Sequence, residues 1–159
     1  MHGRRRSTST SSGNEASRRS ACDKALAMLA RREHSRRELR MRLARDGYAD
    51  EEIEAALASL VDANYQSDER FAEMMVRSRI RQGYGPQRLR AELRTHDVPD
   101  ALIADLLEQA EADWQAQARA QLRRRYGDTP PADYRERAKR MQFLIRRGFA
   151  PAIARAATD

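Results

Sequence analysis

The chain has 159 residues, of which 35% are charged and only 6% aromatic, and its net charge is +7. This composition suits charged helices that share a modest apolar seam rather than one deep core. The single cysteine excludes an internal disulfide and is ordinary in a reducing cytoplasm. No apolar run reaches the roughly 18 residues of a membrane-spanning helix, and no apolar stretch follows the N-terminal arginines as it would in a secretory signal.

The first twenty residues are polar and of low complexity, with five arginines and one glutamate. Such a segment cannot bury enough apolar surface to fold, so we expect residues 1–20 to form a disordered basic arm. The arm could steer an anionic partner towards the protein, or it could be a spacer without a specific function. We favour the spacer.

Residues 21–65 predict a first unit of three helices. The first helix is expected over residues 22–32. The second begins with a capping box made by Ser35 and Glu38 and ends before Gly47. The third is expected to begin at Asp50, as N-cap, and to end near residue 64. Its first turns carry three glutamates, which the helix dipole favours there.

Residues 66–111 predict a second unit of the same design. Ser67 is the expected N-cap of its first helix, which should end at Gly83. Pro86 suits the first position of the second helix, which should run to residue 96. The third helix starts at Asp100 and carries four apolar side chains before residue 111.

Residues 112–159 predict the third unit. Its first helix begins near Asp113 and ends at Gly127. An inserted turn follows over residues 128–131, and Asp133 then caps a basic helix that runs to residue 147. The last helix should begin at Pro151 and end near residue 157.

The units are recognisable as repeats because their residues recur at a fixed spacing of about fifty. A spacing of this kind is typical of stacked helical units, so we predict an all-α protein of nine helices in three tandem three-helix repeats. The correspondence is clearest between the first unit (Leu39, Leu43, Asp50, Ile53, Leu57) and the second (Leu89, Leu93, Asp100, Ile103, Leu107).

Charge alternates from helix to helix. Residues 35–48 hold five arginines and two acids, whereas residues 49–64 hold five acids and no base; residues 77–94 and 97–111 repeat this contrast. Equivalent helices of a stacked array project to one side, so we expect a basic surface from the second helices and an acidic one from the third. Charged faces can also be merely solvated, and adjacent helices of opposite charge attract each other. Because the pattern recurs and the third unit is more basic still, we favour a cationic binding surface.

Residues that could carry catalysis or bind metal are isolated. His2, His34 and His96 have no ligand partners at helical spacing, so a metal site is not expected. Cys22 fits a small core residue. The Gly83–Gly85 segment fits a helix–helix turn better than a phosphate loop, because no strand precedes it. We therefore expect a protein that is not an enzyme and that uses no cofactor or metal.

Three blocks of sequence carry a family resemblance. They are residues 29–39 with Gly47 and Tyr48 beyond them, residues 68–73 followed by Arg77, Arg79, Gly83 and Gly85, and residues 143–149. Together, and in this order, they resemble the bacterial RecX family, regulators of the RecA recombinase. The resemblance spans about residues 21–157.

The resemblance implies an elongated, curved molecule that binds within the groove of the RecA–DNA filament. It implies inhibition of RecA's ATP hydrolysis, strand exchange and coprotease activity, and hence a role in DNA recombination, DNA repair and the SOS response. The partners would be the RecA filament and the single-stranded or duplex DNA inside it. The protein would be a cytoplasmic monomer with no membrane partner and no cofactor.

The alternative is a helical-repeat protein that binds nucleic acid without sequence preference and competes for DNA. Under either hypothesis the residues expected to contact the partner are arginines of the basic helices: Arg36, Arg37, Arg40, Arg77, Arg79, Arg81, Arg88, Arg90, Arg123, Arg124, Arg125, Arg140, Arg146 and Arg147.

Overall fold

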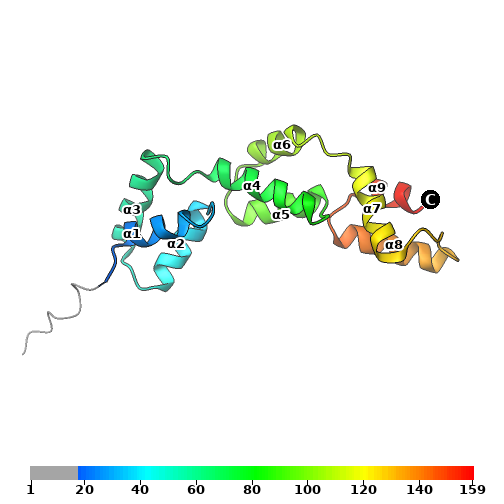
Figure 1. Cartoon of the computed structure of the whole chain (residues 1–159), viewed down its shortest axis with the longest axis horizontal. Helices are drawn as coiled ribbons and strands as arrows, with labels where there is room; N and C mark the ends of the chain where they lie inside the picture. The colour runs from blue at the N-terminus through cyan, green and yellow to red at the C-terminus, as the bar shows by residue number, and fades with distance from the viewer. Residues whose placement is uncertain (1–17) are drawn as a thin grey trace, which may run out of the picture.

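The computed structural model describes residues 18–159, which form nine α-helices and no strand. The helices lie in three groups along an elongated molecule (Figure 1). This arrangement confirms the all-α fold of three three-helix units, whereas most of the expected basic arm lies outside the described residues. The helices are α1 (Ala21–Leu29), α2 (Arg36–Arg45), α3 (Asp50–Asp62), α4 (Asp68–Arg81), α5 (Pro86–Thr95), α6 (Asp100–Gln109), α7 (Trp114–Tyr126), α8 (Tyr134–Arg146) and α9 (Pro151–Thr158).

Side-chain caps fix where several helices begin. The Oγ atom of Ser35 accepts a hydrogen bond from the Glu38 amide at 3.0 Å, and Ser67, Asp113 and Asp133 cap their helices in the same way. The prediction for α3 was wrong by one residue, because its N-cap is Ala49 and its first helical residue is the predicted cap, Asp50. In that position the carboxylate still lies at the positive end of the helix dipole.

Residues with left-handed backbone end several of the helices. Gly47 and Gly148 follow α2 and α8 with φ of +88° and +99°, and Gly83 ends α4 with φ of +82°. Asp97 takes the same place after α5, with φ of 59°. Glycine adopts this conformation without steric cost, so Gly47 and Gly83 stop their helices as predicted.

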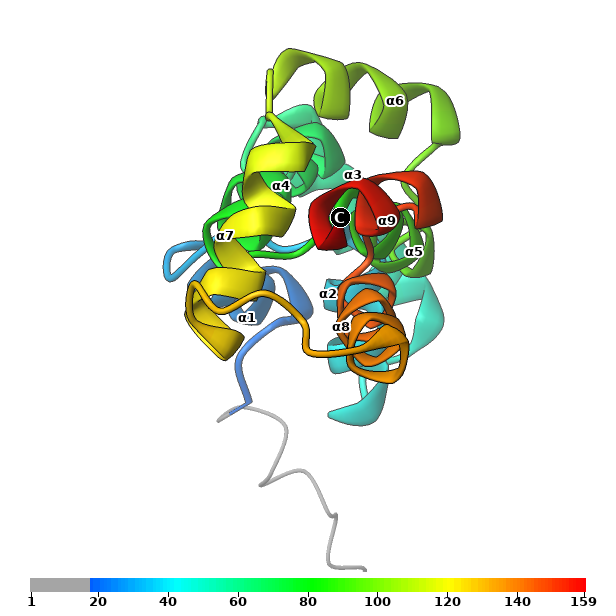
Figure 2. The same cartoon turned by 90° about the vertical axis from the view of Figure 1, so that its right-hand side faces the viewer.

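Each unit has its own apolar core. An alanine five residues after the first N-cap of each unit, at positions 25, 72 and 118, has no exposed surface, so a second helix can approach closely there. The cores are separate clusters of buried side chains, centred on Leu39, Leu43 and Leu57 in the first unit, on Phe71, Leu89 and Ile103 in the second, and on Leu122, Leu144 and Phe149 in the third. The second and third cores are linked by Trp114, at the start of α7, which packs against both. Figure 2 looks along the length of the molecule, with the third unit nearest the viewer.

Among residues 18–159 there is no helix with the length and apolar character needed to cross a membrane.

Candidate partner-binding surface

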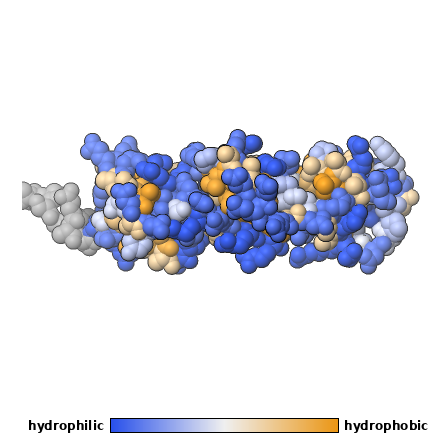
Figure 3. All heavy atoms as spheres, turned by 90° about the horizontal axis from the view of Figure 1, so that it is seen from above, coloured by the Kyte–Doolittle hydropathy of each residue, from blue (hydrophilic) through white to orange (hydrophobic). Residues whose placement is uncertain are grey.

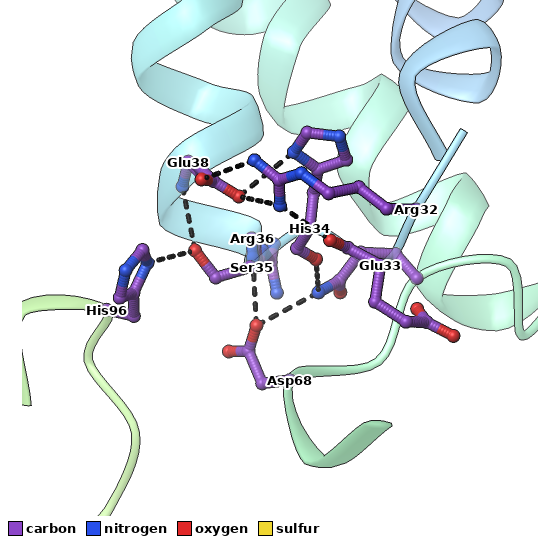
Figure 4. A network of polar contacts seen from close by, with 9 residues as sticks. Arg32, Glu33, His34, Ser35, Arg36, Glu38, Asp68 and His96 are labelled. Atoms are coloured by element: carbon purple, nitrogen blue, oxygen red, sulfur yellow. Dashed lines mark hydrogen bonds and ion pairs between the residues drawn. The ribbon is translucent and has the colours of Figure 1, made fainter. Parts of the chain in front are cut away.

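The junction between the first and second units is built from polar side chains (Figure 4). The Oγ of Ser35, at the start of α2, lies 2.7 Å from Nδ1 of His96, at the end of α5. The amide of Arg36 donates to the Asp68 carboxylate at 2.8 Å, and Arg37 forms an ion pair with Asp97 at 3.1 Å. Every one of these contacts depends on a side chain, and all of the residues except the serine are charged or can become so.

Glu38 links this junction to the loop before α2. Its carboxylate lies 2.9 Å from Nδ1 of the buried His34 and 3.1 Å from the Arg32 guanidinium. Burial alone would raise the pKa of Glu38, but the hydrogen bonds and charges of Arg32 and His34 outweigh burial and lower it. The expected capping box is therefore half formed: Ser35 caps the helix, while the Glu38 carboxylate binds the loop.

The junction between the second and third units includes hydrogen bonds between main-chain groups, in addition to contacts of side chains. The Gly85 amide donates to the carbonyl of Arg147, and the Gln87 amide donates to that of Gly148, each at 2.9 Å. The Arg147 guanidinium donates in return to the carbonyls of Gln82 and Gly83, at 2.6 and 3.1 Å. Gly85 and Gly148 allow the two backbones to approach this closely. A Cβ on Gly85 would collide with the Gly148 carbonyl.

Arginines and aromatic rings alternate across this second junction. The guanidinium carbons of Arg88 and Arg147 lie 4.1 and 4.4 Å from the ring centre of Tyr84, and that of Arg125 lies 4.9 Å from Phe143. Contacts of this kind hold a guanidinium in a fixed orientation without neutralising its charge. We call this run the arginine–aromatic stack; its members are Arg88, Tyr84, Arg147, Phe143, Arg125, Tyr126 and Arg140.

Beside the stack lies a polar hollow of about 360 Å³, here named the junction hollow. It brings together three cations, two from α7 and one from the residue that follows α8, and its lining holds no acidic group. Guanidinium groups present several N–H donors in a plane, which matches the oxygens of phosphates and carboxylates. The hollow is therefore suited to an anionic group; its lining is Gln82, Gln121, Arg124, Arg125, Phe143 and Arg147.

Several of the predicted arginines are instead engaged within the protein. Arg36 and Arg40 of α2 both pair with Glu54 of α3, at 3.5 and 2.6 Å, and the hydrogen bond from Arg40 lowers the pKa of that carboxyl. In the second unit Arg79 and Arg88 share Glu92, at 2.7 and 3.2 Å. In the first unit, attraction between adjacent helices of opposite charge thus accounts for part of the alternating pattern. In the second unit Glu92 lies on the basic helix α5 itself and pairs with arginines of α4 and α5.

Other predicted arginines carry their charge to the surface. Arg77 and Arg81 on α4, Arg124 and Arg125 on α7 and Arg146 on α8 are exposed and form no ion pair within the described part of the chain, and Arg90 on α5 is half-buried and likewise unpaired. Arg123 is exposed too, but it pairs with Asp128 at 3.0 Å. Among the predicted arginines, those without an ion pair therefore lie in the second and third units.

Arg140 differs from every other residue in the predicted set. Its side chain is only 8% exposed, pairs with Glu136 at 2.6 Å and donates to the Thr129 carbonyl at 2.8 Å. It holds the inserted turn against α8 and lies 4.7 Å from the Tyr126 ring. We therefore assign Arg140 to the architecture of the third unit and leave it out of the partner-binding surface.

Sequence reasoning does not find the residues that join the units. The expectation that no partner stands at helical spacing was wrong for His34, because Glu38, four residues on, lies 2.9 Å from its Nδ1. His96 meets Ser35 across 61 positions of the chain. Gln82 and Gln121 carry no signal in a single sequence. The repeat itself holds a usable clue, since positions 35 and 85 correspond, and each contacts the loop after the middle helix of the next unit.

The fold and this surface define a helical-repeat protein with arginines clustered at the junction of its second and third units. Sequence profiles described as the first, second and third three-helix domains of RecX match residues 21–60, 67–107 and 111–158. The chain is 49% identical to the regulatory protein RecX of Halorhodospira halophila and 47% identical to that of Stenotrophomonas maltophilia. Each comparison covers 85% of this chain, and 84% and 83% of the relatives. The chain belongs to the RecX family, which consists of regulatory proteins and not of enzymes.

Two solved structures have the same fold. A crystal structure of a regulatory protein RecX superposes with a TM-score of 0.71 at 25% identity, covering 84% of this chain and 67% of that one. RecX from Lactobacillus salivarius gives a TM-score of 0.69 at 22% identity, covering 86% and 91%. At such low identity the second comparison speaks for the fold alone.

Proposed function

We propose that this protein binds the RecA–DNA filament in the cytoplasm, as a monomer, and restrains RecA's ATPase, strand-exchange and coprotease activities. The observation that carries the proposal is the junction hollow, where Arg124, Arg125 and Arg147 converge without an acidic neighbour in the lining. The resemblance to the RecX family supplies RecA as the partner. The elongated row of units supplies several contact points along a filament.

The mechanism we propose is one of several modest contacts made at once. A filament groove presents repeated protein surfaces around phosphate-rich DNA, and a rod of three units can touch more than one of them. Once one contact has formed, the others follow at high effective concentration, so no single site has to bind tightly. Bridging neighbouring RecA subunits in this way would oppose the motions that accompany ATP turnover.

A test is RecA ATPase activity on single-stranded DNA, with this protein added below the concentration of RecA. We expect inhibition by the unmodified protein and weaker inhibition by Arg124→Glu, which reverses one charge in the hollow and removes no stacked arginine. The matched control is Arg135→Glu, the same charge reversal on an exposed residue of α8 outside the hollow. Equal inhibition by both variants, with unchanged helical circular dichroism, would remove the hollow from the mechanism.

The second candidate function is simple competition for DNA, which the phosphate-suited hollow also favours. The two are separated by titrating the same variants onto naked single-stranded DNA and onto preformed filaments. Binding to phosphates should weaken with salt, and the slope of that dependence should fall by roughly one for each phosphate that a variant no longer binds. Tighter binding to filaments supports the regulator. Equal affinity for both, with equal losses on mutation, would support the competitor.

A further inference from the structure

The middle unit contains an apolar groove that the proposed function does not use. It lies between α4 and α6 and encloses about 560 Å³. Its floor is apolar, made by Val76 and Ile80 of α4 with Leu106 and Ala110 from the α6 side. Its rim is polar and consists of Glu73, Arg77, Arg81 and Gln109.

The lengths of the helices leave the end of α4 incompletely covered. The first helix of the middle unit has 14 residues and its third helix only 10, whereas the first unit has 9 and 13. The last turns of α4 therefore carry apolar side chains that a short α6 covers incompletely, and Ile80 stays partly exposed. The third unit, with 13 and 8, shares this mismatch, so length alone does not set the middle unit apart. Figure 3 looks onto the side of the molecule formed by α6 and shows apolar surface over the middle unit.

The shape of the groove suits a helix. Val76 and Ile80 lie one turn apart and form a single ridge, and the stretch from Glu73 to Arg81 is about 12 Å long at 1.5 Å per residue. Two helical turns fit that length, with apolar side chains at positions i, i+3 or i+4 and i+7 pointing to the floor. A nucleic acid strand fits poorly, because the floor offers no aromatic ring for stacking and no donor for phosphate.

The rim selects for acidic charge. Arg77 and Arg81 stand one turn apart, and within residues 18–159 neither forms an ion pair, whereas Arg79 on the same helix is paired with Glu92 at 2.7 Å. Against them stands one carboxylate, Glu73. The protein's own N-terminal segment does not suit such a rim, because residues 1–20 hold five arginines and one glutamate.

We infer that the α4–α6 groove receives a short, acidic, amphipathic helix of a protein partner. The arginines then have different roles. Arg77 and Arg81 bind carboxylates of the partner helix, while the junction hollow binds other anionic groups of the RecA–DNA filament. The inference rests on the proposed function only for the identity of the partner as a filament protein. The fit of groove to helix stands on its own geometry.

The probe is a synthetic, fluorescently labelled peptide of twelve residues with leucines on one helical face and glutamates elsewhere. Its binding to the full chain is measured by fluorescence anisotropy. Two further peptides serve as comparisons: one with the same residues ordered so that the leucines share no face, and one with lysine in place of every glutamate. We expect the acidic amphipathic peptide to bind at least fivefold more tightly than either.

Two variants place the binding site. Ala110→Phe puts a large side chain into the groove at the exposed end of α6, and its control is Ala63→Phe, at the equivalent exposed end of α3. Arg77→Glu combined with Arg81→Glu reverses the rim, and its control is Arg31→Glu combined with Arg45→Glu, on exposed residues of the first unit. We expect a tenfold or greater loss from each groove variant, less than a twofold change from each control, and a preference for the lysine peptide once the rim is reversed.

Three outcomes would overturn the inference: equal binding of the three peptides, equal effects of groove variants and controls, or a reversed rim that leaves charge preference unchanged. A folded state is verified by circular dichroism for every variant, and the rim variant tests the site even if Ala110→Phe disturbs packing. If the acidic peptide binds as expected but the unmodified protein leaves RecA uninhibited, the groove stands and the proposed function fails.

Discussion

The two junctions of this molecule occupy the same place in the repeat but use different chemistry. In the first, the N-cap residue Ser35 meets His96 through side chains. In the second, the corresponding N-cap residue Gly85 meets Arg147 through the main chain, with a hydrogen bond of 2.9 Å from amide to carbonyl. Equivalent positions of a repeat thus keep an interaction while exchanging the groups that make it.

The difference determines what each junction tolerates. Main-chain hydrogen bonds form whatever side chains are present, but they require the two backbones to approach closely, so the second junction depends on glycine. Side-chain contacts permit a wider approach, but each disappears when one residue changes or titrates. We expect the second junction to be rigid and sensitive to bulk, and the first to be adjustable and sensitive to charge.

The comparison of junctions is meaningful only if the units themselves are alike. Leu43, Leu93 and Leu144 occupy the same position of the three units and are fully buried. Replacing any one by alanine should destabilise the protein by about 2–5 kcal/mol, because each leaves a cavity in a closed core. Midpoints of urea unfolding measure this, and a silent substitution at any of the three would show that the units are not equivalent.

Bulk at Gly148 should break the second junction. A Cβ there would lie 2.5 Å from Arg88 Cβ and 2.6 Å from its amide nitrogen, in a residue whose φ is +99°. Backbone strain alone should cost about 1–3 kcal/mol in Gly148→Ala, and the collision adds to it. The measurement is thermal unfolding.

Gly127→Ala provides the control for that prediction. Gly127 also has a positive φ, of +73°, but nothing lies within 4 Å of the position its Cβ would take. It should show the strain without the collision. Equal losses at the two glycines would mean that the close approach of the backbones contributes nothing.

The first junction should yield to a smaller change. Ser35→Ala removes both the cap of α2 and the interaction with His96, and the loss of a cap typically costs about 1 kcal/mol. A double-mutant cycle with His96→Ala separates the two, since only the interaction across the junction couples the residues. We expect a coupling energy of about 0.5–1.5 kcal/mol, the net value of one hydrogen bond. Additive effects of the two substitutions would show that the contact between Ser35 and His96 does not stabilise the junction.

The smallest effect we predict depends on pH. The pKa of Glu38 is lowered from its ordinary value of 4.5 in the folded protein, so its interactions with Arg32 and His34 stabilise the fold fully above pH 4.5. That stabilisation is lost as the pH falls through the folded-state pKa, because the carboxylate becomes protonated there. Glu38→Gln should therefore unfold more easily than the unmodified protein at pH 7 but nearly equally in acid. If the unfolding midpoints of Glu38→Gln and the unmodified protein differed by the same amount at pH 7 and in acid, the ionised Glu38 carboxylate would not stabilise the fold through Arg32 and His34.

Sequence is sufficient for the parts of the fold that depend on neighbours along the chain. Ser35, Ser67 and Asp133 cap helices as their spacing predicts, because a cap acts within four residues. Gly47 and Gly83 end helices for the same local reason. The recurrence of apolar residues every fifty positions predicts the three units, since each unit closes its own core.

Contacts between units cannot be predicted from the sequence, for a physical reason. Two residues 61 positions apart meet only if the relative orientation of two folded units is known, and no local pattern encodes that orientation. Arg140 is misjudged in the same way: charge alone suggests a surface residue, while burial against Thr129 and Glu136 depends on the inserted turn. The positions of Arg124 and Arg125 on α7 are predictable, but the hollow that they line with Arg147 is not.

The division into units also has a mechanical consequence. A rod pulled from its two ends loads the units in series, so each joint carries the full tension, and at the joint between the second and third units Trp114 packs against both neighbouring cores. The side-chain joint should give way before the glycine-sealed one, because the latter is also held by Trp114, which packs against the cores on both sides of it. The molecule then behaves as a chain of three stiff links with its most compliant hinge beside the N-terminal link. Such a hinge lets the first unit follow a twisting surface, while the second and third units keep a fixed orientation to each other.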